Sequence, residues 1–451
     1  MCLRSTSKRG AFRSLIAAAA LTPLLFFAGQ RAAEAADQGL LAPGDAVVTG
    51  FSGVVPPTTP PPSGDPIDTT FINLDGTSLR VQRLQPNGPP QGQLIPSPAV
   101  FSATARETGQ VFGVTLDNAP TPNIYVLATS AYGIQIVAPD GNGDGLPDRI
   151  KTGEPNAQFM DGQWGQGGSP GSIYRIDGTT GAVSLFASLP NTGPGLGDIV
   201  FDAATQQFFV SDLDSGLVYR LGIDGTVLDT FDHGAAVRPM RGLPAVPDDG
   251  SVMDITNPAF NAEDPATWGY TPKERMVWGM AVHGGRLYYA VADGPQVWSV
   301  GIRLDGSLAD DARWELDVAG LASTDPVSDI AFDAQGRMIL AQRGAQHGSY
   351  DYSVFAEPKT ASVVRYRREI PDDANTPSTW VQVPEQYAIG FRPDGHNAAG
   401  GIALGPNYDD KGMIVPNSCG QYLWSTGEGL RDDPNLAQQL AVGGPAPVDG
   451  L

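Results

Sequence analysis

Short apolar segments separated by turn residues most strongly constrain what this chain can fold into. Runs of about four to eight Val, Ile, Phe and Tyr residues alternate with clusters of Gly, Asp, Asn and Pro. Almost no apolar pattern follows the 3.6-residue period of a helix, whereas such short runs are typical of antiparallel strands. The sequence therefore predicts an all-β protein.

These strands recur in a repeated unit. One unit reads LGDIVFDAATQQFFVSDLDSGLVYRLGIDG (residues 196–225), with an apolar strand, a turn, a second apolar strand and a third that contains a tyrosine. Four more units follow this pattern, at residues 109–133, 277–306, 327–344 and 399–429. Equivalent positions lie 86, 81, 50 and 72 residues apart, at Gly113, Ile199, Met280, Ile330 and Ile402. The shortest spacing is close to the length of one four-stranded propeller blade, about 40 to 50 residues.

The repeat predicts a single β-propeller domain over residues 67–440, with six four-stranded blades. Five units are explicit, and residues 68–84 supply strands for a sixth blade or for closing the ring with the C-terminal strand. Segments rich in Gly, Pro and Asp at residues 153–172, 232–275 and 345–360 are expected as loop insertions between blade strands.

The unit at residues 196–225 resembles the NHL repeat and the gluconolactonase-like superfamily of six-bladed propellers. In that superfamily a turn containing aspartate precedes an aromatic strand, and Val210-Ser211-Asp212 and Val291-Ala292-Asp293 match the end of this strand. The resemblance implies the fold and carries no activity by itself.

The two ends of the chain have a different composition from the repeats. Four basic residues up to Arg13 precede an apolar run at residues 15–27, and the small residues Ala33 and Ala35 follow, which predicts a cleaved secretory signal peptide at residues 1–35. A Pro-rich linker is expected at residues 36–66 and a flexible tail at residues 441–451. We expect a secreted or periplasmic protein that is not inserted in a membrane after cleavage.

The chain is strongly acidic, with a formal net charge of -21. Without residues 1–35 the charge becomes -25, because that segment contains five basic residues and one acidic residue. Such a surface repels phosphate backbones, so no nucleic-acid partner is expected. We expect a monomer whose partner is a protein or a glycan.

A candidate calcium loop lies within DGNGDGLPD. Its side-chain oxygens and one carbonyl follow the ligand spacing of EF-hand, dockerin and thrombospondin type 3 loops, which this stretch resembles, at Asp140, Asn142, Asp144, Leu146 and Asp148. Lys151 stands where the bidentate glutamate of an EF-hand would be, so we expect weak calcium binding, about 0.1 to 1 mM. The alternative is a solvated acidic turn. In either case the loop would brace an insertion and would not act on a substrate.

A second constellation follows from propeller geometry, because the residues that begin each innermost strand surround one mouth of the central channel. These positions hold Phe112, Asp198, Trp278, Asp329, His396 and Asn397. Lactonase-type propellers hold a metal there with Glu, Asn and Asp, and no glutamate occupies a matching position in this chain. The catalytic candidates are thus Asp198, Asp329, His396 and Asn397. The alternative is that these short polar side chains only satisfy backbone groups at the channel mouth.

Aromatic residues in the insertions have two interpretations. These residues could form a binding rim, or they could fold their own loops onto the blades. The aromatic residues in question are Trp268, Tyr270, Tyr350, Tyr352 and Phe355. Taken together, the sequence predicts a calcium-binding β-propeller that acts as a binding or scaffold module of the cell envelope or secretome. A metal-dependent, lactonase-like hydrolase with its site at the channel mouth is the alternative.

Overall fold

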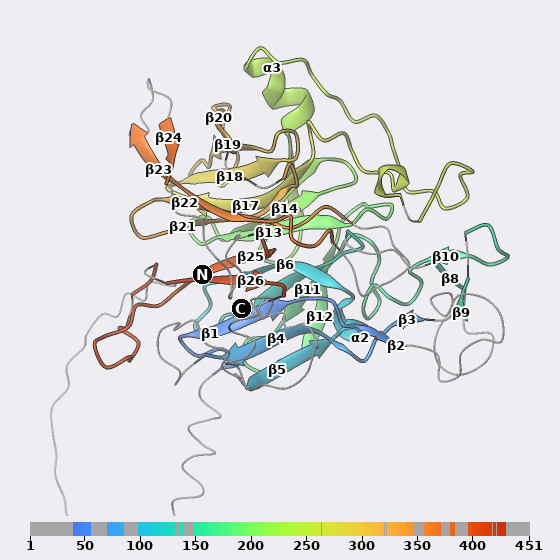
Figure 1. Cartoon of the computed structure of the whole chain (residues 1–451), viewed down its shortest axis with the longest axis horizontal. Coiled ribbons are helices and arrows are strands. Elements are labelled where there is room, and N and C mark those ends of the chain that lie inside the picture. The colour runs from blue at the N-terminus through green and yellow to red at the C-terminus, as the bar shows by residue number, and fades with distance from the viewer. Residues whose placement is uncertain are drawn as a thin grey trace, which may run out of the picture.

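The chain folds into antiparallel sheets arranged radially around one axis, as expected for a β-propeller (Figure 1). The computed structural model describes residues 39–55, 70–84, 98–131, 136–138, 148–150, 152–262, 264–319, 321, 323–346, 356–370, 379–383, 396–416, 418–420 and 422–429. The predicted signal peptide and the predicted C-terminal tail lie outside these residues. The all-β prediction is confirmed.

Four sheets have four strands each. Blade 1 contains β6 (Val111–Leu116), β7 (Ile124–Ala128), β11 (Ser172–Ile176) and β12 (Val183–Ser188). Blade 2 contains β13 (Leu196–Asp202), β14 (Gln207–Asp212), β15 (Leu217–Gly222) and β16 (Val227–Asp232). Blade 3 contains β17 (Val277–His283), β18 (Arg286–Val291), β19 (Gln296–Gly301) and β20 (Arg313–Asp317). Blade 4 contains β21 (Val327–Phe332), β22 (Met338–Gln342), β23 (Val363–Ile370) and β24 (Thr379–Gln382).

The described part of the chain has five blades, so the predicted number of six is wrong. The fifth blade is the pair β25 (Ala398–Gly405) and β26 (Tyr422–Gly427). Of the segment predicted for a sixth blade or for ring closure, the described residues 70–84 do not pair with this C-terminal blade. Their strand β4 (Thr77–Arg83) instead lies in a three-stranded sheet between β1 (Asp45–Thr49) and β5 (Ala99–Thr104).

Part of the predicted Pro-rich linker is also structured. Strand β1 pairs with β4 in antiparallel register, and the hydroxyl of Thr49 donates a hydrogen bond to the carbonyl of Phe112 in β6, at 2.7 Å. Two short strands, β2 (Val54–Val55) and β3 (Phe71–Ile72), pair beside this sheet. The linker prediction is thus corrected for the β1 segment, because its apolar residues find partners in strands that lie far away in the sequence.

Every innermost strand carries a β-bulge at the same place. In β13, the four residues from Leu196 to Ile199 lie opposite three residues of β14, and β6, β17, β21 and β25 are irregular at the corresponding position. The regular ladder resumes at Ile199, Met280 and Ile402 as the repeat predicts, and in β21 it resumes at Asp329, one residue before Ile330. In β6 the residue after the bulge is Val114, so the position predicted at Gly113 is corrected by one residue.

The main core consists of apolar clusters between neighbouring blades. Between blades 1 and 2, the rings of Tyr125 and Phe208 lie 4.4 Å apart between centroids, and Phe201 packs behind them. Between blades 2 and 3, Phe209 and Tyr289 are fully buried in a similar cluster. Because each face of a blade is covered by the next blade, the strands need apolar residues on both faces.

Two insertions pack against each other and form what we call the insertion lobe, residues 136–138, 148–150, 152–160, 250–262 and 264–270. The first contributes a small sheet in the order β10 (Gln158–Phe159), β8 (Ile136–Ala138), β9 (Asp148–Arg149). The second contributes the 3-10 helix η3 (Pro265–Thr267) and the fully buried Trp268, whose core also contains Ile136, Met253 and Phe260. The lobe therefore has an apolar core of its own.

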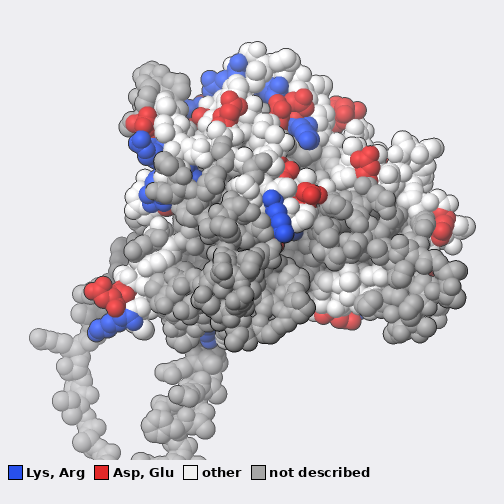
Figure 2. All heavy atoms as spheres, in the orientation of Figure 1, with Lys and Arg blue, Asp and Glu red and all other residues white. Residues whose placement is uncertain are grey.

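In the part of the chain that the structure describes, three further short helices lie outside this lobe. A π-helix, η2 (His233–Val237), continues into α3 (Arg238–Met240) after blade 2, and α2 (Ala105–Thr108) connects β5 to β6. Within the described residues, no helix has both the length and the apolar character that crossing a membrane requires. On the face drawn in Figure 2, acidic and basic side chains of the described residues lie close together and do not form one basic patch.

Candidate functional site

Aspartate or glycine stands directly before Val114, Ile199, Met280, Ile330 and Ile402 in the innermost strands of the five blades. The five positions, taken around the ring from blade 1 to blade 5, hold Gly113, Asp198, Gly279, Asp329 and Gly401. The two predicted carboxylates thus occupy equivalent places in blades 2 and 4. Their bonds explain why short polar side chains occur there.

The carboxylate of Asp198 joins blade 2 to blade 3. One oxygen accepts a hydrogen bond from the backbone N–H of Ile199 and the other from the N–H of Met280 in β17, both at 2.8 Å. Ser211 supports this arrangement, because its hydroxyl accepts from the N–H of Asp198 at 2.8 Å and donates to the carbonyl of Trp278 at 2.9 Å. The carboxylate supplies acceptors for N–H donors that the bulged ladder leaves without partners.

Asp329 has the same role one junction further on. Its carboxylate accepts from the N–H of Ile402 in β25 at 2.8 Å and so joins blade 4 to blade 5. Burial raises the pKa of Asp329 to about 7, although the bonds from the N–H groups of Ile402 and Ile330 oppose this shift. Burial also raises the pKa of Asp198 well above 3.8, and the nearby charge of Asp329 raises it further. The charge of Asp329 thus acts on Asp198 through the interior of the ring.

Glycine at the other channel positions permits close contact between innermost strands. A Cβ on Gly279 would lie 2.6 Å from the backbone nitrogen of Asp329, and a Cβ on Gly113 would lie 3.1 Å from the Cα of Asp198. Neither junction has room for a larger residue. At these positions the junctions thus consist of backbone and of two carboxylates whose oxygens already accept backbone hydrogen bonds.

Asn397 is held at the end of β26. Its side-chain nitrogen donates to the carbonyl of Glu428 at 2.9 Å, its own carbonyl accepts from the N–H of Glu428, and its backbone forms a parallel bridge with Ala361. Asn397 is fully buried, whereas His396 beside it is partly exposed. These bonds hold Asn397 between blades 4 and 5.

An apolar cluster at the channel mouth was not predicted. Phe112 and Trp278 belong to one cluster, against which Phe51 and Tyr270 pack. The side chain of Gln346 donates to the hydroxyl of Tyr270 and to the carbonyl of Ala131, which ties two loops together over this cluster. The signal in the sequence was the pair of aromatic residues directly before the channel glycines. Their contacts with distant loops could not be read from it.

The remaining sequence candidates lie in the insertions. Trp268 is fully buried and its indole N–H donates to the carbonyl of Asn261 at 3.1 Å, so it folds its own loop onto the lobe. Tyr350, Tyr352 and Phe355 lie outside the described residues. Of the predicted calcium ligands, Asp148 begins β9 and pairs with Ala138 of β8. The other four, Asp140, Asn142, Asp144 and Leu146, are outside the described residues.

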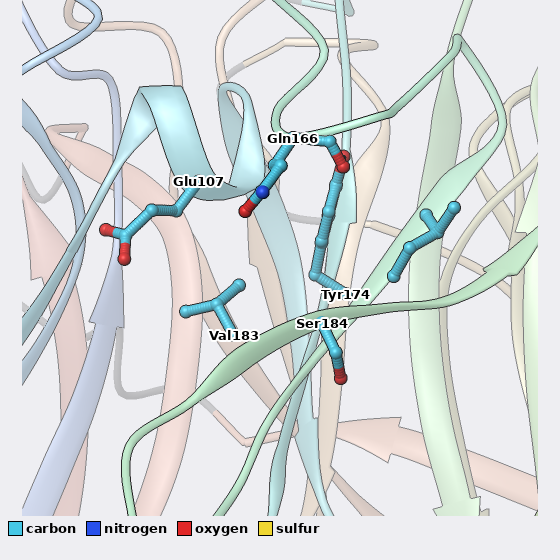
Figure 3. Close-up of a pocket in the computed structure, with 6 residues that line it drawn as sticks. Glu107, Gln166, Tyr174, Val183 and Ser184 are labelled. Carbon is cyan, nitrogen blue, oxygen red and sulfur yellow. The ribbon is translucent and has the colours of Figure 1, made fainter.

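The best-formed hollows in the described residues flank the outer strand of blade 1. A hollow of about 290 Å³ lies between Glu107 of α2 and residues Val183 and Ser184 of β12. Figure 3 shows Glu107 and Gln166 above this hollow, Val183 and Ser184 below it, and Tyr174 between them. A larger hollow of about 570 Å³ lies on the side of blade 2 and shares Ser184 and Leu185. Among the described residues, no three His, Cys, Asp or Glu side chains are grouped so as to hold a metal ion.

Radial four-stranded antiparallel sheets around a narrow channel define this protein as a β-propeller. No protein-family model and no curated protein matches the chain. It is similar to a 6-phosphogluconolactonase-like protein from Bacteroides fragilis, with 14% identity, 86% of this chain and 88% of that chain covered, and a TM-score of 0.36. A second such protein, from Bacteroides uniformis, has 14% identity, 79% and 87% coverage and a TM-score of 0.34.

A chain of a nidogen/laminin complex has 12% identity, 71% coverage of this chain and 89% of that chain, and a TM-score of 0.34. At these values the similarities carry no argument about activity or ligand. The assignment to the propeller fold depends on the sheets themselves.

Proposed function

We propose that this protein is an exported, calcium-braced β-propeller that acts as a binding or scaffold module, contacting a protein or glycan through its insertion lobe. The observation that carries the proposal is the core of the lobe, in which Trp268, Met253 and Phe260 are buried against Ile136 from a different insertion. Loops with a core of their own can present a fixed surface, and binding residues in proteins concentrate on loops positioned by a rigid scaffold.

Calcium fits this proposal as a brace of the lobe. The candidate loop at residues 139–147 connects β8 to β9, and β8 is also paired with β10. A cation held by Asp140, Asn142, Asp144, Leu146 and Asp148 would fix both ends of that connection. It would supply no chemistry to a substrate.

Calcium should stabilise the wild-type protein but not Asp144→Ala. At about ten times its Kd, the ion is expected to add about 1.4 kcal/mol to the free energy of unfolding of the part that it holds. Thermal melting and limited proteolysis of residues 136–160, each with calcium and with a chelator, measure this effect. Asp254→Ala, which changes an exposed lobe carboxylate outside the loop, is the matched control. If wild type and Asp144→Ala melt alike at every calcium concentration, the brace is disproved.

The hydrolase alternative is favoured by one observation, the proximity of Asp198 and Asp329 in the channel. Both carboxylates already accept backbone hydrogen bonds across blade junctions, and an aromatic cluster lies over the mouth. A metal ion there would have to compete with the N–H groups of Met280 and Ile402 for the same oxygens. We therefore propose binding in preference to hydrolysis.

One experiment separates the two functions. The purified protein without residues 1–35 is applied to envelope fractions of the producing cells, untreated or treated with protease or periodate, and is also assayed for lactone hydrolysis with added divalent cations. Saturable binding that Trp268→Ala loses and Met413→Ala keeps is the expected result. Equal binding by both variants would exclude the lobe as the contact surface. Metal-dependent hydrolysis abolished by Asp198→Asn would favour the alternative.

A further inference from the structure

The larger hollow beside β12 lies between two blades at the outer rim of the propeller. We call it the rim hollow, and its lining includes Tyr125, Arg175, Leu185, Phe186, Ile223 and Asp224. The turn between β15 and β16 rests directly on β12, since a Cβ on Gly225 would lie 2.5 Å from the carbonyl oxygen of Phe186. Gly225 has φ +83, a conformation that suits glycine. The hollow is therefore built by a fixed contact between blades 1 and 2.

The base of the rim hollow is aromatic and well packed. The ring of Phe186 lies edge to face with Tyr125 at 4.9 Å and with Phe208 at 5.5 Å between centroids. Tyr125 donates its hydroxyl hydrogen to Asp117, which also accepts from Asn123. These contacts hold the base in one arrangement, so a ligand would meet a preformed surface.

Large apolar side chains are exposed around this hollow. Leu185 and Ile223 line it and are 44% and 48% exposed, and Val227 and Leu228 of β16 are each 50% exposed. Gly222, next to Ile223, is close to Leu228, because a Cβ there would lie 3.7 Å from a methyl carbon of that leucine. A group of exposed apolar residues around a concave surface is typical of protein interaction sites.

The charge beside these apolar residues is negative. Of the three aspartates in residues 221–237, Asp232 is paired with Arg275 at 3.4 Å, so the negative charge beside the hollow comes from Asp224 and Asp229. Asp224 is exposed, and the side chain of Asp229 is 62% exposed at 3.8 Å from Arg220. The guanidinium of Arg175 is already bonded to Asn123 and to Asp177. A partner that covers this surface therefore meets apolar groups bordered by carboxylates.

We propose that the rim hollow is a docking surface for a protein partner that inserts an apolar side chain flanked by lysine or arginine. Complementary charge favours such a partner, and the net charge of -21 extends the attraction beyond the contact itself. A second copy of this chain would bring the same aspartates and would be repelled. This surface consists of residues other than those of the insertion lobe, so the inference goes beyond the proposed function and can fail without it.

The probe is a fluorescein-labelled peptide, KKLWLKK, with its charge-reversed twin EELWLEE, followed by fluorescence anisotropy on the chain without residues 1–35. We expect the lysine peptide to bind saturably and more weakly at higher salt, and the glutamate peptide not to bind. Ile223→Lys should weaken binding at least about tenfold, because it removes an apolar contact and adds a like charge. Met413→Lys is the matched control, since Met413 is 57% exposed and undergoes the same change of charge.

Each other outcome overturns the inference. If Ile223→Lys and Met413→Lys lose the same affinity for KKLWLKK, only the overall charge of the protein attracts the peptide. Binding of EELWLEE as tight as that of KKLWLKK would contradict the acidic rim. A dimer detected by light scattering and abolished by Ile223→Lys would assign the hollow to self-association. Binding of neutral maltohexaose that Ile223→Lys abolishes, without peptide binding, would assign it to a glycan.

Discussion

Replacing Asp198 with alanine should lower the free energy of unfolding by about 2 to 4 kcal/mol. The change leaves the N–H groups of Ile199 and Met280 without acceptors in a junction where Asp198 is only 7% exposed. Each buried donor left without a partner costs about 1 to 3 kcal/mol. Urea unfolding followed by tryptophan fluorescence measures the difference. Asp224→Ala, which removes an exposed aspartate from the turn after β15, should change stability by less than about 0.5 kcal/mol.

The same variant should show a pH dependence of known sign. Because the pKa of Asp198 and that of Asp329 are raised in the folded protein, the native state retains protons that the unfolded state has lost. The contribution of these two raised pKa values to the free energy of unfolding is therefore fully present below about pH 4. It decreases as the pH rises toward about 7. Asp198→Ala removes the part of this contribution that comes from Asp198. The loss of unfolding free energy caused by Asp198→Ala should therefore be larger at about pH 5 than at about pH 8. A penalty that grows with pH would contradict the raised pKa values.

Acid should destabilise the protein through His233, and His233→Gln should remove that effect. His233 begins the π-helix η2 and is fully buried, with its Nδ1 3.1 Å from the hydroxyl of Tyr289 and its ring 4.7 Å from that of Trp298. Within the described residues its Nε2 is buried without a hydrogen-bond partner. Burial lowers the pKa of His233 to about 3, and the charges of Arg238 and Arg275 contribute.

The sign follows from the proton balance of this histidine. Between about pH 6.5 and 3 the unfolded chain binds a proton at His233 that the folded chain does not bind, so stability falls as the pH falls. From about pH 7 to about pH 4.5 this loss should reach about 2 to 3 kcal/mol in the wild type and be absent in His233→Gln. Urea unfolding at both pH values measures it. His283→Gln is the control, because the ring of His283 is only partly buried against Phe332 and should contribute less. Parallel pH profiles for wild type and His233→Gln would show that His233 titrates normally.

The fold could be predicted from the sequence where the information is local. The stretch at residues 196–225 alternates apolar segments and turns, and it forms β13, β14 and β15 almost as predicted. The number of blades could not be predicted in this way, because it depends on which distant strands pair. Strand β1 shows the reason, since its short apolar segment becomes a strand only through its pairing with β4, about 30 residues away.

The repeat places Asp198 and Asp329 at similar positions of the innermost strands of blades 2 and 4. The hydrogen bonds of the two carboxylates could not be predicted from it. Their partners, the N–H groups of Met280 and Ile402, are exposed to them by bulges that have no sequence signature of their own. The acidic residues of the calcium loop, by contrast, are a local pattern, and the loop stays a prediction that the calcium experiment tests.

The alternation of aspartate and glycine around the channel has a consequence for how the ring can open. Asp198 ties blade 2 to blade 3 and Asp329 ties blade 4 to blade 5, whereas the junctions at Gly113 and Gly279 are contacts between backbones. Blades 3 and 4 are joined further out, where Arg368 donates to the hydroxyl of Tyr288 and Trp380 donates to the carboxylate of Glu315. Opening the ring at Asp198 or Asp329 has to break the carboxylate bonds first. In hydrogen exchange, the amide protons of Met280 and Ile402 should therefore exchange only when these junctions open, later than amide protons in exposed turns.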